Sequence, residues 1–247
     1  MATRSAHQAH IRSEHMFFTG MAVLLLATVF TGFAPTYYLL NQLHGTTGAG
    51  QPGGSNLTPL VHVHAIAFSA WMLLFVGQTT LIATGRVNWH RKLGIVGAFL
   101  AVAMVVLGWM VAVEGSRLGH RPPMVEKYTF LIIPITNALM FGVFVAAGIW
   151  ARSRAAFHKR FMLLATITLL TPAIVRMHLP VVPAGPIGGF IVNDAFILAA
   201  WGWDWLSNGR VHRVLLWGGV AFIASQPLRI WFAQTDLWVS FAKGLIG

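Results

Sequence analysis

The chain has 247 residues, of which 56% are hydrophobic and 9% are charged, and its formal net charge is +11. In soluble domains roughly a quarter of all residues are charged, so this composition excludes an ordinary soluble protein. The cations lie in short segments between apolar blocks, which argues against a nucleic-acid-binding role. The chain has no cysteine, which excludes disulfides, thiolate-held iron–sulfur clusters and covalent c-type haem but leaves histidine-ligated cofactors open.

Apolar blocks of about 20 or more residues follow one another along the chain, and each is long enough to cross a hydrocarbon core about 30 Å thick. They predict an all-α protein, a seven-transmembrane helix bundle, with spans at 16–40, 60–84, 93–114, 128–150, 161–182, 188–206 and 214–234. Residues 1–15 then form a polar N-terminal tail, 16–234 the seven-helix membrane domain and 235–247 an interfacial C-terminal tail. The first block is too long for a signal-peptide core and no cleavage site follows it, so we expect a retained span.

The distribution of Lys and Arg predicts the orientation of these spans. Eleven of the 17 cations lie in the N-terminal tail or in the loops after spans two, four and six. The positive-inside rule therefore places the N-terminus in the cytoplasm and the C-terminus outside. The last span has no lysine for a retinal Schiff base, which excludes a rhodopsin. The stretch GAGQPG in the first outer loop matches a dinucleotide-binding pattern, but a proline lies inside it and no strand precedes it, so we interpret it as a flexible loop.

Spans two to seven look like three copies of one hairpin. The inner loops GRVNWHRKLG, ARSRAAFHKRFM and NGRVHRVLLW each contain an arginine, then a histidine, then another cation. Each preceding span has a polar residue followed seven positions later by an aromatic one, and seven residues make nearly two helical turns, so each pair shares a face. The pairs are His64 and Trp71, Asn137 and Phe144, and Asp194 and Trp201. This pattern predicts one leading helix followed by three similar helical hairpins.

The basic inner loops contain side chains that we expect at the level of the lipid headgroups, because cations at helix starts meet lipid phosphate there. They are Arg86, His90, Arg91, His158, Lys159, His212 and Arg213. The three histidines could instead converge on a metal ion if the hairpins surrounded an axis. Asp204, at the inner end of span six, is interpreted as an interfacial partner of Arg210 or Arg213.

Polar side chains that are costly in lipid gather in the outer third of the predicted bundle. Arg176 lies roughly 9 Å below the outer end of span five at 1.5 Å per residue, and Asp194 lies at a similar depth in span six, so we expect the two to pair. Pro172 and Pro227 are expected to kink their spans near this layer. The predicted ligand pocket consists of His64, Asn137, Arg176, His178, Asp194 and Arg229, with Glu114 nearby.

This outer layer has two arginines and one clearly intramembrane acid. Such an excess of positive charge indicates a bound anion, the acid group of a lipid or cofactor, or a water-filled cavity. The alternative is a buried pair of Arg176 and Asp194 that locks two helices together while the histidines are hydrated at the interface.

One stretch resembles a known group of proteins. It is HVHAIAFSAWMLLFVGQTTLIATGRVNWHRKLG, with its spaced His64, Trp71, Gln78, Arg86, His90, Arg91 and Gly94. It is similar to uncharacterised bacterial multi-pass membrane proteins of unknown function, as are FTGFAPTYYLL and FHKRFMLLAT, and together these cover roughly a third of the chain. The resemblance implies a proteobacterial inner-membrane protein, so the C-terminus and the pocket would face the periplasm, and it transfers no activity.

Three functions remain open for the predicted pocket. The first is a membrane redox or ligand-binding protein holding haem, quinone or a metal. Haem b would use His64 and His178, with the arginines meeting its propionates, and a metal would use both histidines with Asp194. The second is a transporter for a small anion or for protons. The third is a non-catalytic accessory subunit of a larger membrane complex, or a homo-oligomer. We find no H-E-x-x-H or G-x-S-x-G motif, which argues against hydrolysis but leaves open whether the protein is an enzyme.

Overall fold

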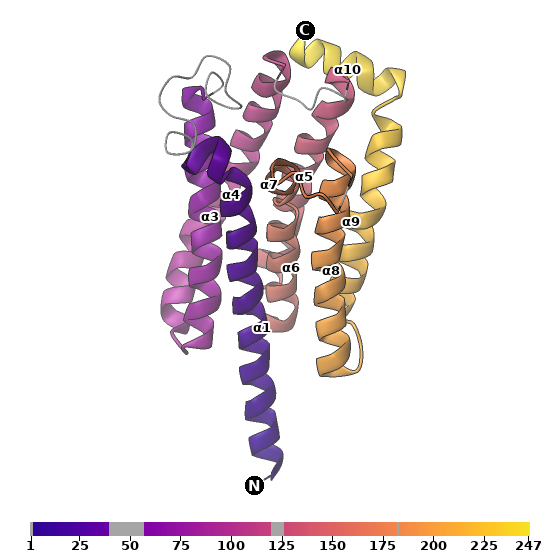
Figure 1. The fold of residues 1–247 in the computed structure, drawn as a ribbon. Coiled ribbons are helices and arrows are strands. Elements are labelled where there is room, and N and C mark those ends of the chain that lie inside the picture. The colour runs from indigo at the N-terminus through magenta and orange to yellow at the C-terminus, as the bar shows by residue number, and fades with distance from the viewer. Residues whose placement is uncertain (1, 40–56, 120–125, 182) are drawn as a thin grey trace.

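The computed structural model describes residues 2–39, 57–119, 126–181 and 183–247. The regular structure in these ranges is helical, which confirms the predicted all-α class. Figure 1 shows long helices that run side by side as a bundle, with the two ends of the chain at opposite ends of it. The GAGQPG stretch lies outside the described residues.

The helices follow the predicted apolar blocks closely. In chain order they are α1 (Ala2–Phe33), α3 (Pro59–Ala83), α4 (Val87–Arg117), α5 (Lys127–Trp150), α6 (Ala155–Ile167), α7 (Thr171–Arg176), α8 (Pro186–Asn208), α9 (Arg213–Phe232) and α10 (Asp236–Ile246), and a π-helical turn, η1 (Ala34–Tyr38), continues α1. Five of them, α1 with η1, α3, α4, α5 and α9, are long and apolar enough to cross a membrane. The protein is therefore a multi-pass helical membrane protein, and the seven-span count stays a prediction.

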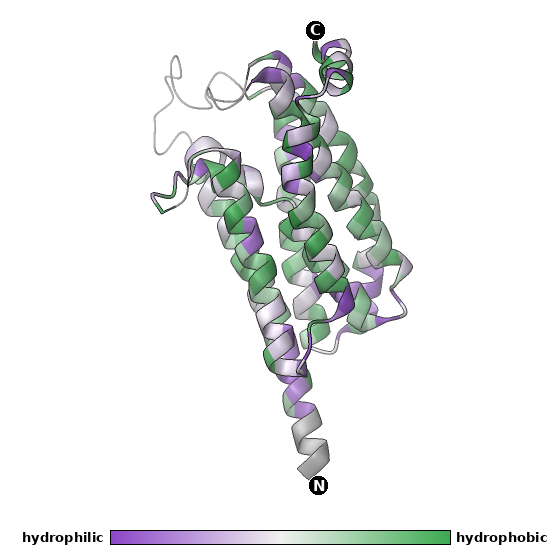
Figure 2. Ribbon diagram, turned by 90° about the vertical axis from the view of Figure 1, so that its right-hand side faces the viewer, coloured by the Kyte–Doolittle hydropathy of each residue, from purple (hydrophilic) through white to green (hydrophobic). Residues whose placement is uncertain are grey.

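The bundle has an apolar middle and two polar ends, as the hydropathy colouring in Figure 2 shows. We call the end where α1 starts the N-terminal end. The connections α3–α4, α5–α6 and α8–α9 also lie there, and α10 lies at the opposite, C-terminal end (Figure 1). Successive helices pack as the hairpins α3–α4, α5–α6 and α8–α9. This is compatible with the predicted hairpins, while their descent from one repeated unit remains a prediction.

The segment formed by α6 and α7 is the centre of the bundle. Helix α6 packs against α5, α9, α1 and α8, and α7 packs against α1 and α8. Residues 163–171 are all buried. This segment was predicted as one continuous span, 161–182, but the structure interrupts it between Ile167 and Thr171.

Pro172 explains the interruption. It has no N–H to donate to the carbonyl of Thr168, so the helix cannot continue regularly through this turn. The backbone tightens instead, and the N–H groups of Leu169 and Leu170 donate to carbonyls three residues back at 3.2 and 3.1 Å. Pro227, by contrast, lies inside a continuous α9.

Helices α1 and α7 approach each other closely at Gly32. A Cβ atom at this position would lie 2.7 Å from the Cα atom of Ala173 and would overlap its backbone. Gly32 is therefore the residue that lets the first helix contact the centre of the bundle.

The predicted C-terminal tail is a helix that lies across the C-terminal end. α10 contacts α4 and α5. Trp238, Ala242 and Ile246 are buried and spaced four residues apart, which places them on one helix face. The indole N–H of Trp238 donates to the carbonyl oxygen of Tyr128 at 2.8 Å, and this hydrogen bond connects α10 to the start of α5.

Candidate functional site

Arg229, on α9, points into the bundle near its C-terminal end and is only 4% exposed. Its Nη1–H donates to Asn137 Oδ1 at 2.6 Å. Its Nη2–H donates to the Ser225 hydroxyl at 2.6 Å, and its Nε–H donates to the Ser225 carbonyl oxygen at 3.2 Å. The rings of Phe190 and Phe222 lie 5.4 and 5.6 Å from the guanidinium. All of these partners are neutral, and no described carboxylate forms an ion pair with Arg229.

Asp194 joins this group through an amide. The side-chain N–H of Gln226 donates to Asp194 Oδ1 at 2.7 Å, and Gln226 lies one turn before Arg229 on α9. The sulfur of Met140, on α5, lies 3.8 Å from Arg229 Nη2. We call the set Asn137, Met140, Asp194, Ser225, Gln226 and Arg229 the Arg229 cluster. It contains three of the six predicted pocket residues, and it lies between α5, α8 and α9.

The other three predicted pocket residues lie elsewhere. Arg176 is exposed at the end of α7, where its Nη1–H donates to the Pro172 carbonyl at 2.8 Å and its guanidinium lies 4.7 Å from the ring of Phe33. His64, on α3, stacks on Phe68 with ring centroids 4.1 Å apart. The expected pairing of Arg176 with Asp194 was therefore wrong, because the interrupted segment directs Arg176 towards α1 and not towards α8.

His178 also has a local partner. It lies in the left-handed region, with φ +48°, and its Nδ1–H donates to the carbonyl oxygen of Arg176 at 2.8 Å. His64 and His178 thus each have a local contact, and the haem ligand pair stays a prediction. Within the described ranges, no group of three or more His, Asp or Glu side chains could hold a metal, so His64, His178 and Asp194 do not form the predicted metal site.

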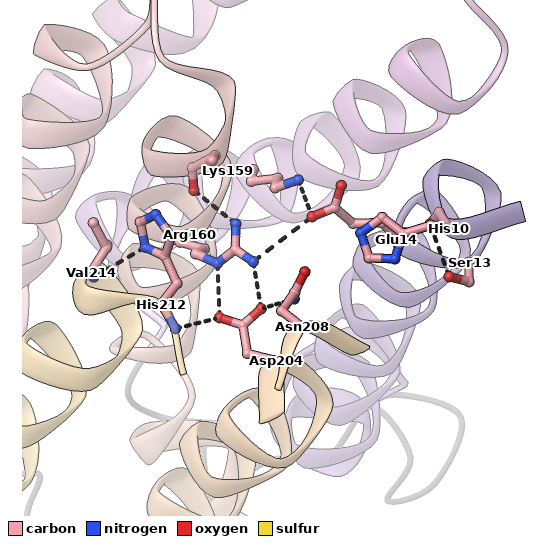
Figure 3. Close-up of polar contacts among 10 residues, drawn as sticks. His10, Ser13, Glu14, Lys159, Arg160, Asp204, Asn208, His212 and Val214 are labelled. Atoms are coloured by element: carbon pink, nitrogen blue, oxygen red, sulfur yellow. Dashed lines mark hydrogen bonds and ion pairs between the residues drawn. The ribbon is translucent and has the colours of Figure 1, made fainter. Parts of the chain in front are cut away.

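The N-terminal end of the bundle holds a second polar group, which sequence reasoning missed (Figure 3). Asp204, near the end of α8, is fully buried. The guanidinium of Arg160, on α6, donates to both of its carboxylate oxygens, with Nε 3.0 Å from Oδ2 and Nη2 close to Oδ1. The backbone N–H of His212 donates to Oδ2 at 3.0 Å, and the Asn208 amide reaches Oδ1 at 3.4 Å.

Lys159 and Glu14 extend this group to α1. The ammonium of Lys159 forms an ion pair with Glu14, whose Oε1 also lies 3.8 Å from Arg160 Nη2. We call the set Glu14, Lys159, Arg160, Asp204, Asn208 and His212 the Asp204 cluster. It joins α1, α6, α8 and the α8–α9 connection.

The Asp204 cluster corrects two expectations. Asp204 does not pair with Arg210 or Arg213, because its two carboxylate oxygens accept from Arg160 on α6 and, within its own loop, from the backbone of His212. Lys159 was expected at lipid headgroups, but its ammonium pairs with Glu14. The signal in the sequence was weak, since the buried partner of Asp204 lies 44 residues away in the chain.

The remaining predicted headgroup residues differ in exposure. Arg86, Arg91 and Arg213 are exposed at the N-terminal end. His212 caps α9, because its Nδ1 accepts from the Val214 N–H at 3.2 Å. Burial lowers the pKa of the His212 imidazole, and the positive charge of Arg160 lowers it further.

His90 and His158 lie beside each other, with ring centroids 6.0 Å apart. Of the three inner histidines that could have converged on a metal ion, two are therefore neighbours. The ring of the third, His212, packs instead against Phe157, with centroids 4.8 Å apart.

Two surface grooves are lined by residues that belong to neither cluster. One, of about 770 Å³, runs along α1 beside the end of α3 and includes Arg12, His15 and Ala83. The other, of about 420 Å³, lies on α4 and includes Trp109 and Glu114. Glu114 accepts a hydrogen bond from the Thr58 hydroxyl at 2.8 Å, so it does not join the Arg229 cluster.

Comparison of the chain with protein-family models, with curated proteins and with solved structures finds no match.

Proposed function

We propose that this chain is a seven-span membrane carrier that binds a small organic anion in the Arg229 cluster. The observation that carries the proposal is the burial of Arg229 among neutral partners only. An arginine charge within a membrane bundle is expensive and normally has a counter-charge. The planar fork of a guanidinium also matches a carboxylate with two parallel hydrogen bonds. Asp194 lies in the same cluster but forms no ion pair with Arg229 among the described residues, so a carboxylate ligand would supply a direct counter-charge.

The interrupted central segment favours transport over simple binding. No described residue donates a hydrogen bond to the carbonyl oxygens of Thr168 and Leu169, which lie in the buried gap between α6 and α7. Asn193, next in sequence to Asp194, is also fully buried. Its amide N–H donates to the Thr171 hydroxyl at 2.7 Å, while its Oδ1 has no partner. Interrupted helices with free backbone carbonyls are common at the substrate sites of secondary transporters.

The membrane arrangement in this proposal follows the sequence. α6–α7 and α8 would be the fifth and sixth spans, because they lie inside the bundle alongside the five apolar helices. The excess of Lys and Arg at the N-terminal end supports a cytoplasmic location for that end. The Arg229 cluster would then face the periplasmic side of a bacterial inner membrane, as the resemblance of the sequence implies.

The proposal is tested by uptake into proteoliposomes with acetate, benzoate and succinate as probes. The wild-type chain is expected to take up at least one of these anions, and Arg229→Gln is expected to abolish that uptake. Arg176→Gln is the matched control, because Arg176 is an exposed arginine outside the Arg229 cluster. Size-exclusion profiles would show that both variants remain folded.

Binding is measured separately, as the rise in melting temperature of the detergent-solubilised protein with each anion, against chloride at equal ionic strength. Stabilisation without uptake would indicate a binding protein and would overturn the carrier part of the proposal. Equal stabilisation of wild type and Arg229→Gln would overturn the anion site itself.

A further inference from the structure

His90 and His158 come from different hairpins but meet at the N-terminal end of the bundle. His90 lies in the first turn of α4 and His158 in the first turn of α6. Their ring centroids are 6.0 Å apart and the rings are nearly perpendicular, at 86°. With metal–nitrogen bonds of about 2 Å and about 1.1 Å from nitrogen to ring centre, two imidazoles on one ion would have centroids about 5 Å apart in tetrahedral geometry and about 6.2 Å in linear geometry. The observed separation lies within this interval.

The hydrogen bonds of the two rings leave nitrogen lone pairs available. The Nδ1–H of His158 donates to the Gly148 carbonyl oxygen at 2.8 Å. Such a bond to a backbone carbonyl fixes the tautomer and leaves Nε2 unprotonated, which is the usual arrangement of a metal-binding imidazole. The Nδ1 of His90 is buried and has no hydrogen-bond partner.

Gln78, on α3, supplies a third donor atom. Its backbone carbonyl lies within hydrogen-bonding reach of the ring of His90, so that one ring nitrogen of His90 faces Gln78. Its side-chain amide lies against Gly94, one turn after His90 on α4, where a Cβ would be 3.7 Å from the amide nitrogen. The Oε1 of Gln78 is buried and unpartnered, like the Nδ1 of His90. Gln78 and His90 thus each have one buried atom without a partner, and the ring of His158, whose Nε2 is left free by its hydrogen bond to Gly148, lies next to the ring of His90.

We propose that His90, His158 and Gln78 bind one divalent transition-metal ion of the zinc and copper class. Imidazole nitrogen suits these ions, and an amide oxygen with water can complete a four-coordinate shell. A bound ion would give partners to both orphaned atoms and would link the α3–α4 hairpin to α6. The site lies at the opposite end of the bundle from the Arg229 cluster, so it does not depend on the proposed function.

The test is a titration of the purified, untagged full chain with Zn²⁺, followed by calorimetry. The histidines at positions 7, 10 and 15 would also bind zinc, so the parent protein carries His7→Gln, His10→Gln and His15→Gln. This parent is expected to bind one Zn²⁺ per chain. His90→Gln and His158→Gln should each weaken binding at least about 10-fold, since even outer partners of metal ligands are worth 10–100-fold. His178→Gln, which alters an exposed histidine, should bind like the parent.

A spectroscopic measurement identifies the ligands. Cu²⁺ bound to the parent should show nitrogen hyperfine coupling in electron paramagnetic resonance, and this coupling should be reduced in His90→Gln. Absence of stoichiometric binding, or unchanged affinity in both histidine variants, would overturn the proposal. A haem absorption band that depends on the same two histidines would also overturn it.

If a histidine variant fails to fold, variants of Gln78 test the metal site instead. Gln78→Glu should bind Zn²⁺ more tightly, because a carboxylate replaces an amide as ligand. Gln78→Leu should bind it more weakly. Equal affinities for these two folded variants would contradict the site.

Discussion

Arg160 and Arg229 are the buried arginines at the two ends of the bundle, and their surroundings differ in one respect. They are 3% and 4% exposed, so burial does not separate them. Arg160 faces the buried carboxylate of Asp204, which takes two of its N–H groups, and Glu14 lies nearby. Arg229 faces an amide, a hydroxyl and a backbone carbonyl. Charge compensation, and not burial, therefore distinguishes the structural ion pair of Arg160 from the candidate ligand site at Arg229.

The largest expected effect follows from removing the counter-charge of Arg160. Asp204→Asn should lower the free energy of unfolding by about 3–5 kcal/mol, because it leaves a buried guanidinium unpaired. Thermal unfolding of the detergent-solubilised protein measures this loss. Asp236→Asn is the control, since Asp236 is exposed at the start of α10. If Asp204→Asn melted at the same temperature as the control, the ion pair of Arg160 with Asp204 would not stabilise the fold.

A second variant tests the contact of α1 with the centre of the bundle, because α1 also carries Glu14 of the Asp204 cluster. Gly32→Ala should cost about 1–3 kcal/mol of stability, since the added methyl overlaps the backbone of Ala173 and must push the helices apart. Gly20→Ala provides the control, because a Cβ there meets no atom within 4 Å. The two alanine variants are compared by thermal unfolding, and equal stabilities would contradict the close approach seen at Gly32.

Stability also separates the two arginines. Arg229→Gln should change the free energy of unfolding by less than about 1.5 kcal/mol, because the amide can still bond Asn137 and no buried carboxylate loses its ion partner. Arg160→Gln should cost several times more, since it leaves Asp204 charged and unpaired. Denaturation of both variants in parallel gives the ratio. Equal losses would show that both arginines are structural.

The smallest effect concerns pH and His212. The folded protein holds the pKa of this imidazole below its ordinary value, because burial and the charge of Arg160 disfavour protonation. The unfolded chain therefore binds a proton more readily, and stability should be complete above about pH 6.5 and should fall as the pH drops below it. His212→Asn should show a shallower dependence of melting temperature on pH between about 7 and 5. If the melting temperature of His212→Asn depended on pH as steeply as that of the wild type, protonation of His212 would not cause the loss of stability in acid.

The sequence predicts the elements of this molecule better than their contacts. Apolar block lengths place α3 and α5 to within about a residue or two of their observed bounds, because spanning a membrane demands continuous hydrophobic runs. Asn137, Asp194 and Arg229 could be found because each interrupts such a run. Their grouping follows from their similar depth.

The errors have a common physical cause, which is the rotation of helices about their own axes. The interruption before Thr171 changes the direction in which Arg176 points, and no spacing rule reports that change. Asp204 and Arg160 lie on different hairpins, so nothing in the local sequence selects Arg160 over Arg210 or Arg213. The sequence alone locates charged residues along the chain, but their partners depend on which faces of neighbouring helices are in contact.

The central position of α6 and α7 has a consequence for how the protein is made. The α6–α7 segment is buried among other helices, and α8, although it is 23 residues long, does not reach the apolarity of the five clear spans. In the seven-span arrangement proposed above, the α6–α7 segment gains little by contact with lipid tails, and α8 gains less than the five clear spans do. Their insertion as the chain leaves the ribosome should therefore depend on α1, α3, α4 and α5 already being in the bilayer, and a truncated chain lacking α1 should leave the later segments exposed to quality-control proteases.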